Sequence, residues 1–205
     1  MGARSDVKAV TITADTVALD ADGISVAAAG GNNAALVIGG ALASGGSVTL
    51  SHGRVVTILS AGDDSAKSFT VTGTDVDGDS QTESITGANA GTATGSKYFK
   101  TISGISAVGN PAGNVSAGVN GSAADVIWAG RSRLKGVFLT STATAGTVNF
   151  LTTSPIGTSI LKLNSVSDAD ATRDVTIPSD GVVFSAGIYI QYTVSTFLTA
   201  TVFHA

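Results

Sequence analysis

The acidic residues constrain the backbone of this chain more than any other feature of its sequence. Fourteen of the fifteen are aspartate, and Glu83 is the one glutamate. Aspartate favours turns and caps, whereas glutamate favours helix interiors. The aspartates also gather in short groups, at 20–23, 62–64, 74–79 and 167–171, with β-branched and aromatic runs between them. This arrangement predicts short strands joined by polar turns.

The runs between the aspartate groups alternate with the period of a strand. In residues 187–194, Ile188, Ile190 and Tyr192 fall on one face, and the residues between them fall on the other. Strands are predicted in this way over 54–60, 68–74, 135–141, 146–152, 173–177, 187–194 and 198–205. No window keeps an apolar helical stripe for three turns. The predicted fold class is therefore all-β, built as small β-sandwich or jelly-roll-like modules.

The length of 205 residues allows one large domain or two small ones. Glycine, asparagine, serine and alanine cluster at 118–126, between two strand-like runs, which indicates a boundary near residue 123. We therefore expect a first β module over 21–122 and a second over 123–205. Residues 1–20 are expected to form an N-terminal arm or an added edge strand.

The composition excludes several classes of partner and site. The net charge of −4 lacks the basic excess of a nucleic-acid-binding surface, and the absence of cysteine excludes disulfides and thiolate sites. The longest stretch without a charged side chain, 23–53, is broken by "GGNN" and "SGGS" and falls short of a membrane helix. The N-terminus has no continuous apolar run typical of a secretory signal. We expect no nucleic acid, no membrane and no cofactor.

The stretch "TDVDGD" places Asp75, Asp77 and Asp79 at alternate positions and invites comparison with a calcium loop. The EF-hand spacing fails, because Ser80 stands where a glycine is needed and Thr86 where a glutamate is needed. The pair Asp77–Gly78 between two strand-like runs is typical of a hairpin with a type I′ turn. We therefore expect a hairpin and no metal site, although adventitious calcium at the aspartates stays open.

Residues able to carry catalysis are few. His52 is expected in a turn, where a lone histidine is usually a solvated donor, and His204 is the penultimate residue of the sequence. Glu83 is expected to be a solvated carboxylate on a strand. The alternative, that it forms an acid–base pair with an aspartate for sugar cleavage, is the weaker interpretation. The sequence contains no nucleophile-elbow or phosphate-loop motif. We expect no catalytic residue and a protein that is not an enzyme.

One basic cluster is a candidate interface. Arg131, Arg133 and Lys135 alternate, so on a strand all three would project from one face, and Trp128, the single tryptophan, lies just before them. This pattern fits a docking stripe for an acidic partner. It equally fits a strand that uses charge to prevent edge-to-edge aggregation.

Two regions carry a resemblance to a known class of proteins. The segment 71–119 contains "TGTD", "TESITGANAG" and "YFKTI", and it follows "GGALASGGSVTLSHGRVVTILSAGDDS" at 39–65. It resembles small virion structural proteins of tailed bacteriophages. The stretches 130–150 and 177–205 are similar to a second module of such proteins. The resemblance covers about residues 20–205.

This resemblance implies a non-enzymatic structural role in a virion that is assembled in the host cytoplasm. Within that class we expect a capsid decoration or cement protein, which stabilises the shell by contacts with the major capsid protein or other virion subunits. A homo-oligomer, with a trimer as the first guess, would bury its weakly polar surface. A structural protein of the tail, neck or fibre base is the alternative. A surface adhesin module is a further one.

Overall fold

The structure is a computed structural model that describes residues 6–205. Within this range the chain forms fifteen β-strands in antiparallel sheets and contains no α-helix. The predicted all-β, sandwich-like fold class is thereby confirmed. Over the same residues, no helix that could cross a membrane is present.

The chain divides into two compact units. Residues 17–123 form one of them, here called the inserted unit. The N-terminal residues up to Thr16 combine with 124–205 to form the other, here called the terminal unit. Strand β8 (Asn114–Trp128) gives its first part to the inserted unit and its last part to the terminal unit. The N-terminal segment therefore belongs with the C-terminal module and is not separate from both.

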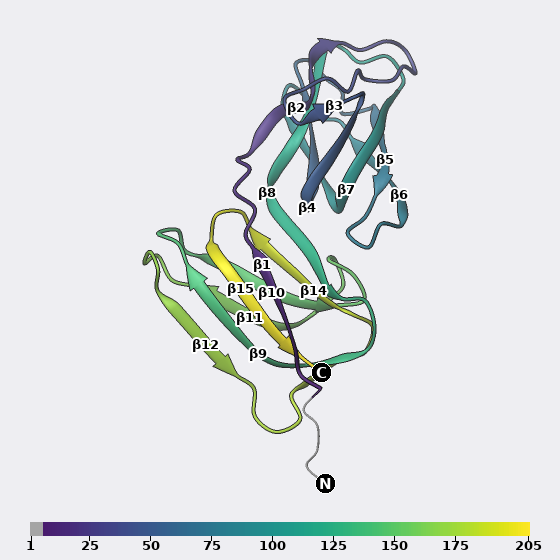
Figure 1. Cartoon of the computed structure of the whole chain (residues 1–205). Helices are drawn as coiled ribbons and strands as arrows, with labels where there is room; N and C mark the ends of the chain where they lie inside the picture. The colour runs from purple at the N-terminus through teal and green to yellow at the C-terminus, as the bar shows by residue number, and fades with distance from the viewer. Residues whose placement is uncertain (1–5) are drawn as a thin grey trace. The chain divides into compact units, whose positions relative to one another are not determined.

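The inserted unit is a single sheet of long, bent strands around one apolar core (Figure 1). Its strand order is β8-β4-β7-β5-β6, with β2 paired to β8 and β3 paired to β4. Its other strands are β2 (Asp20–Ala29), β3 (Ala43–Ser44), β4 (Ser47–Ser60), β5 (Ser68–Thr74), β6 (Ser80–Thr86) and β7 (Thr92–Val108). Register shifts in β4 and β7 bend these strands, and β7 pairs with β4 and β5 along successive parts of its length.

The glycine-rich stretch at 30–46 covers part of this core mostly without forming strands. Leu36 N–H donates to the Ile105 carbonyl at 2.8 Å, and Ala107 N–H donates to the Ala34 carbonyl at 2.9 Å. A Cβ at Gly40 would collide with the Asp22 and Gly23 carbonyls, so only glycine allows this close approach. These contacts let Leu36 and its apolar neighbours pack on the core.

One arginine lies fully buried in the inserted unit. Arg54, on β4, has no exposed surface. Its guanidinium donates to the Val17 carbonyl at 3.1 Å and to the Asn120 carbonyl. These acceptors lie near the points where the chain enters and leaves the unit. A buried guanidinium holds its place only while its donors find acceptors, so Arg54 ties the first and last segments of the unit to β4.

The terminal unit packs two sheets face to face. One has the order β1-β15-β9-β12 with β13 paired to β9, and the other has the order β11-β10-β14-β8. Tyr192 and Phe197, from opposite sheets, form an edge-to-face pair with ring centroids 4.8 Å apart. The strands are β1 (Lys8–Thr13), β9 (Ser132–Ser141), β10 (Gly146–Thr152), β11 (Thr158–Ser165), β12 (Thr172–Thr176), β13 (Val182–Phe184), β14 (Ile188–Thr193) and β15 (Phe197–His204).

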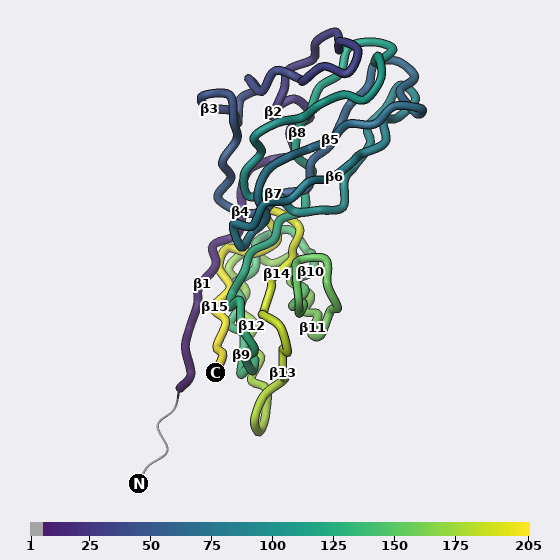
Figure 2. The backbone as a smooth tube through the Cα atoms, turned by 90° about the vertical axis from the view of Figure 1, so that its right-hand side faces the viewer, coloured from purple at the N-terminus to yellow at the C-terminus, as the bar shows by residue number. Residues whose placement is uncertain are grey.

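Strand β1 is the edge strand of its sheet. It pairs antiparallel with β15 in a register that runs from Lys8 opposite His204 to Thr13 opposite Thr199. Figures 1 and 2 show the purple β1 alongside the yellow β15. Val10 and Ile12 are half-buried, whereas the residues between them are exposed. Of the two possibilities left open by the sequence, the structure shows an added strand.

Candidate functional site

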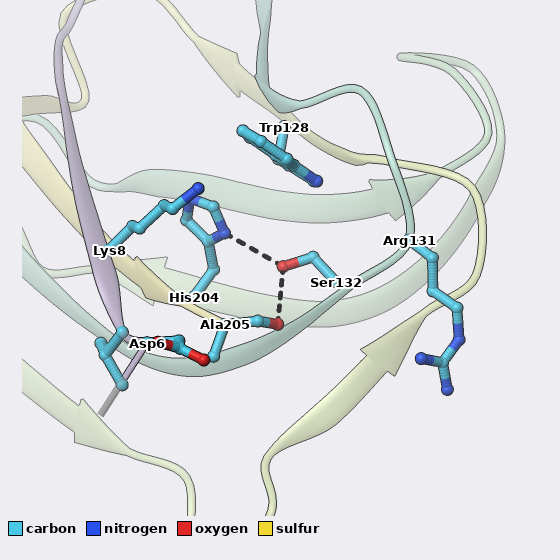
Figure 3. A pocket seen from close by; sticks show the side chains of 8 residues that line it. Asp6, Lys8, Trp128, Arg131, Ser132, His204 and Ala205 are labelled. Carbon is cyan, nitrogen blue, oxygen red and sulfur yellow. Dashed lines mark hydrogen bonds between the residues drawn. The ribbon is translucent and has the colours of Figure 1, made fainter. Parts of the chain in front are cut away.

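A pocket of about 520 Å³ opens at one end of the terminal unit (Figure 3). It lies where β1 and β9 begin and where β8 and β15 end. Lys8, Trp128, Arg131, Ser132 and His204 supply its main side chains. Because β1 and β15 are antiparallel, the first residue of one strand meets the last residue of the other. Pairing of the two ends of the sequence therefore builds this site.

His204 is buried at the inner wall of the pocket, with only 2% of its surface exposed. Its Nδ1 lies 3.0 Å from Ser132 Oγ, which also lies 3.1 Å from the Ala205 carbonyl oxygen. A carbonyl can only accept, so the Ser132 hydroxyl donates to Ala205 and must accept from Nδ1–H. This assigns the neutral Nδ1–H tautomer. The lone pair of His204 is then on Nε2, which has no hydrogen-bond partner among residues 6–205.

Trp128 and Lys8 complete this wall. The Trp128 and His204 ring centroids are 5.4 Å apart, with the planes inclined by 37°. The Lys8 ammonium lies 4.6 Å from the centroid of a Trp128 ring, within cation–π range. Trp128 stays 41% exposed, so part of its indole faces the pocket. Burial lowers the pKa of His204 below its usual range, and the positive charge of Lys8 lowers that pKa further.

This lowered pKa predicts that acid destabilises the terminal unit through His204. In the unfolded chain the histidine binds a proton near its usual pKa of about 6.5, whereas the folded unit resists that proton. The contribution of the neutral His204 to the free energy of unfolding is therefore fully present above about pH 6.5. It falls as the pH decreases from there towards the pKa of the folded state. Urea unfolding, followed by Trp128 emission between pH 8 and 5, measures this effect. The free energy of unfolding should fall more steeply with decreasing pH for the wild type than for His204→Gln. Equal slopes for the two proteins would contradict the assignment.

The four interface candidates do not form one stripe. Trp128 and Arg131 line the pocket, and Arg131 precedes β9 instead of lying on it. Arg133 and Lys135 lie on the outer face of β9. Ser132, which precedes Arg133, and Leu134, which lies between the two basic residues, are buried on the inner face. The expectation that Arg131, Arg133 and Lys135 project together from a strand was therefore wrong. The chain bends between β8 and β9, which places Arg131 at the pocket.

Neither histidine lies in a turn. His52 lies inside the long strand β4, where a turn was expected, because a register shift in β4 absorbs the glycine beside it. His204, for which the sequence supports no specific expectation, is buried and hydrogen-bonded. Its contact with Ser132 is not the arrangement of a nucleophile and its base. The serine hydroxyl donates to a carbonyl, and the histidine lone pair is on the nitrogen remote from it.

The Glu83 carboxylate, on β6, accepts hydrogen bonds from the backbone of two residues of β7. It accepts from Ser96 N–H at 2.6 Å and from the Ser96 hydroxyl at 2.8 Å. It also accepts from Lys97 N–H at 3.3 Å. A side chain at Gly95 would press against this carboxylate, so glycine leaves room for it. Glu83 is therefore a half-exposed carboxylate whose oxygens are held by amides of β7, a contact that the sequence did not predict.

The aspartate-rich stretch is the hairpin between β5 and β6, as predicted, with Thr74 opposite Ser80. The Asp75 carboxylate accepts from the N–H groups of Asp77 and Asp79 at 3.0 and 2.9 Å. The type I′ expectation was wrong, since Gly78 is the one residue of this loop with positive φ, at 91°. Gly78 N–H donates to the Asp75 carbonyl at 3.2 Å, which is typical of a longer hairpin loop with a single left-handed glycine.

This geometry predicts that Gly78→Val destabilises the inserted unit far more than Asp77→Asn does. A Cβ at Gly78 would meet no atom within 4 Å, so the cost comes from the backbone alone. A β-branched residue at positive φ costs about 1–3 kcal/mol. Asp77→Asn should change the free energy of unfolding by less than about 0.5 kcal/mol. Chemical denaturation compares the two variants, and equal midpoints would show that the loop does not need its glycine.

No group of three or more histidine, aspartate or glutamate side chains placed to hold a metal ion occurs in residues 6–205. The aspartate loop turns its Asp75 oxygen inward to amides, which leaves that oxygen engaged. The pocket of the terminal unit is therefore the main candidate site. Comparisons of the chain with protein-family models, curated proteins and solved structures gave no match.

Proposed function

We propose that this chain is a non-enzymatic structural protein of a tailed-phage particle, and that it decorates and stabilises the capsid shell. The similarity of residues 71–119 and of the C-terminal stretches to virion proteins supports the class. The observation that supports binding as the mechanism is the outer face of the sheet β1-β15-β9-β12. We take this face as the surface that contacts the shell.

The middle of that face carries threonine hydroxyls and an exposed aromatic ring. Thr11, Thr201 and Phe138 lie in register across β1, β15 and β9, and the hydroxyls of Thr11 and Thr201 are 3.0 Å apart. Phe138 is 38% exposed in the middle of the sheet. Threonine hydroxyls paired with each other give up little hydration when covered, and an exposed aromatic ring is a typical anchor of a protein interface. The face is therefore suited to burial by a partner.

The partner should be acidic where it meets this face. Arg133 and Lys135 project from β9 on the same side as Phe138. The terminal unit contains seven basic and seven acidic residues, whereas the inserted unit contains four basic and eight acidic ones. The whole formal charge of −4 thus resides in the inserted unit. The basic residues of the outer face can then meet an acidic capsid subunit.

Binding to shells that lack this protein tests the proposal. Particles of the phage that encodes the chain would be stripped of it and incubated with purified wild type, Phe138→Asp, or Lys135→Glu. We expect both variants to bind at least tenfold more weakly. Lys162→Glu, a lysine-to-glutamate change on β11 outside this sheet, serves as the control. Unchanged binding of Phe138→Asp would exclude the face as the contact.

Imaging of the same particles at subunit resolution tests the position in the virion. Hundreds of copies on the shell are the expected result. A handful of copies at one vertex or along the tail would replace the decoration role with a neck, tail or fibre-base role. Sedimentation of the purified protein tests the proposed homo-oligomer, for which a trimer is the expected state.

A further inference from the structure

We propose that the pocket of the terminal unit binds a sugar acid, that is, a saccharide ring bearing a carboxylate. The pocket volume of about 520 Å³ lies within the range of small-molecule sites, roughly 300–1,000 Å³. It suits a ligand of one or two sugar rings. The partly exposed indole of Trp128 offers an aromatic wall for the apolar C–H groups of such a ring.

The buried His204 supplies the polar contact that points to a hydroxylated ligand. Its Nε2 carries a lone pair and has no hydrogen-bond partner in the described part of the chain, although the side chain is only 2% exposed. A buried polar atom without a partner destabilises the fold, so a ligand group that donates to it is favoured. Figure 3 shows the Lys8 ammonium group beside this imidazole. Lysine has a long, flexible side chain, so a small movement of Lys8 gives a ligand hydroxyl access to Nε2.

The charges around the pocket indicate that the ligand carries a carboxylate. Lys8 and Arg131 contribute two positive charges, and Asp6 contributes one negative charge. The excess of one positive charge matches a single ligand carboxylate. After the small movement that opens Nε2, Lys8 can donate to that carboxylate, Arg131 lines the same pocket, and Asp6 can accept from ring hydroxyls. Neutral sugars would leave the cations without a counter-charge, and simple carboxylates would leave Nε2 and the indole wall unused.

This inference does not depend on the proposed capsid role. The pocket uses the inner side of β1 and β15, whereas the proposed shell contact uses the outer side of the same sheet. The test uses free ligands and purified protein without any particle. Failure of one proposal therefore says nothing about the other.

The test is a titration of the full chain with D-glucuronate at constant ionic strength, followed by the emission of Trp128. Because Trp128 is the single tryptophan, its emission reports the pocket directly. We expect a saturable change with a millimolar dissociation constant, since one ring makes few contacts. D-Glucose, which shares the ring, and acetate, which shares the carboxylate, should each bind at least fivefold more weakly.

Variants assign the binding to the pocket. Lys8→Ala should weaken glucuronate binding at least fivefold, and Arg131→Ala should weaken it in the same direction. Lys162→Ala, a lysine of the same unit outside the pocket, should bind like the wild type. Ligand-observed NMR measures the variants, because Lys8→Ala itself changes the surroundings of the indole, and thermal melts confirm that each variant is folded.

Three outcomes would overturn the proposal. The first is the absence of any saturable response to glucuronate. The second is binding of glucose or acetate as tight as that of glucuronate, which would remove the need for the ring and the acid together. The third is a folded Lys8→Ala protein that binds glucuronate with wild-type affinity.

Discussion

Replacement of Arg54 by alanine is expected to lower the free energy of unfolding of the inserted unit by about 3 kcal/mol or more. The change removes the donors that the Val17 and Asn120 carbonyls accept from, and it leaves a large void in a fully buried position. A unit of this size should then melt roughly 10–20 °C lower. The effect is large because the Arg54 side chain is fully buried, so its removal leaves a void as well as two lost hydrogen bonds.

Hydrogen-exchange mass spectrometry during denaturation assigns the effect to a unit. Peptides of 17–123 should lose protection in Arg54→Ala, while Trp128 emission follows the terminal unit separately. Lys67→Ala is the matched control, because it removes a long cation from the same unit at a position that is only half-buried. An Arg54→Ala protein as stable as the Lys67→Ala protein would show that the guanidinium does not tie the ends of the unit together.

Removal of β1 is expected to lower the free energy of unfolding of the terminal unit by about 4 kcal/mol or more. This is comparable to the loss of several apolar contacts in a core. A chain that begins at Ala14 lacks the half-buried Val10 and Ile12. It also exposes the backbone edge of β15 and the side of the buried Val202. An unpaired, apolar edge of this kind promotes association with other chains, so aggregation at lower temperature is expected as well.

Trp128 emission during urea unfolding measures this loss. Thr11→Ala, which changes the exposed face of the same strand, should shift the free energy of unfolding by no more than about 0.5 kcal/mol. Ile12→Ala, on the half-buried face, should fall between that control and the truncated chain. A truncated protein with an unchanged unfolding midpoint would mean that β1 is dispensable and that the C-terminal module folds without it.

Elements that depend on local patterns were predictable. The strands expected at 68–74 and 146–152 coincide with β5 and β10. Alternation of side chains and the turn preference of aspartate act within a few residues, so the sequence displays them directly. The hairpin at 75–79 was predicted for the same reason. Its turn type was not, because the loop length depends on the register that pairs Thr74 with Ser80.

The candidate site was not predictable as a whole. Trp128 and Arg131 were identified from their own neighbourhood in the sequence, but their separation from Arg133 and Lys135 depends on the bend before β9. No local signal marked Lys8 or Ser132. The position of His204 opposite Lys8 follows only from the pairing of β1 with β15. No motif around His52 or His204 in the sequence indicated which of them would be buried in the fold.

The sequence by itself determined the all-β class, the places of most strands and turns, and the lack of familiar catalytic motifs. These properties follow from backbone preferences and side-chain alternation, which are short-range. The tertiary structure alone decided that Arg54 is buried and that the N-terminal strand completes the C-terminal module. It also decided that His204, Trp128 and Lys8 share one pocket. Those outcomes depend on strand pairing between distant segments, and the energy of such pairing comes from surfaces that exist only after the chain has folded.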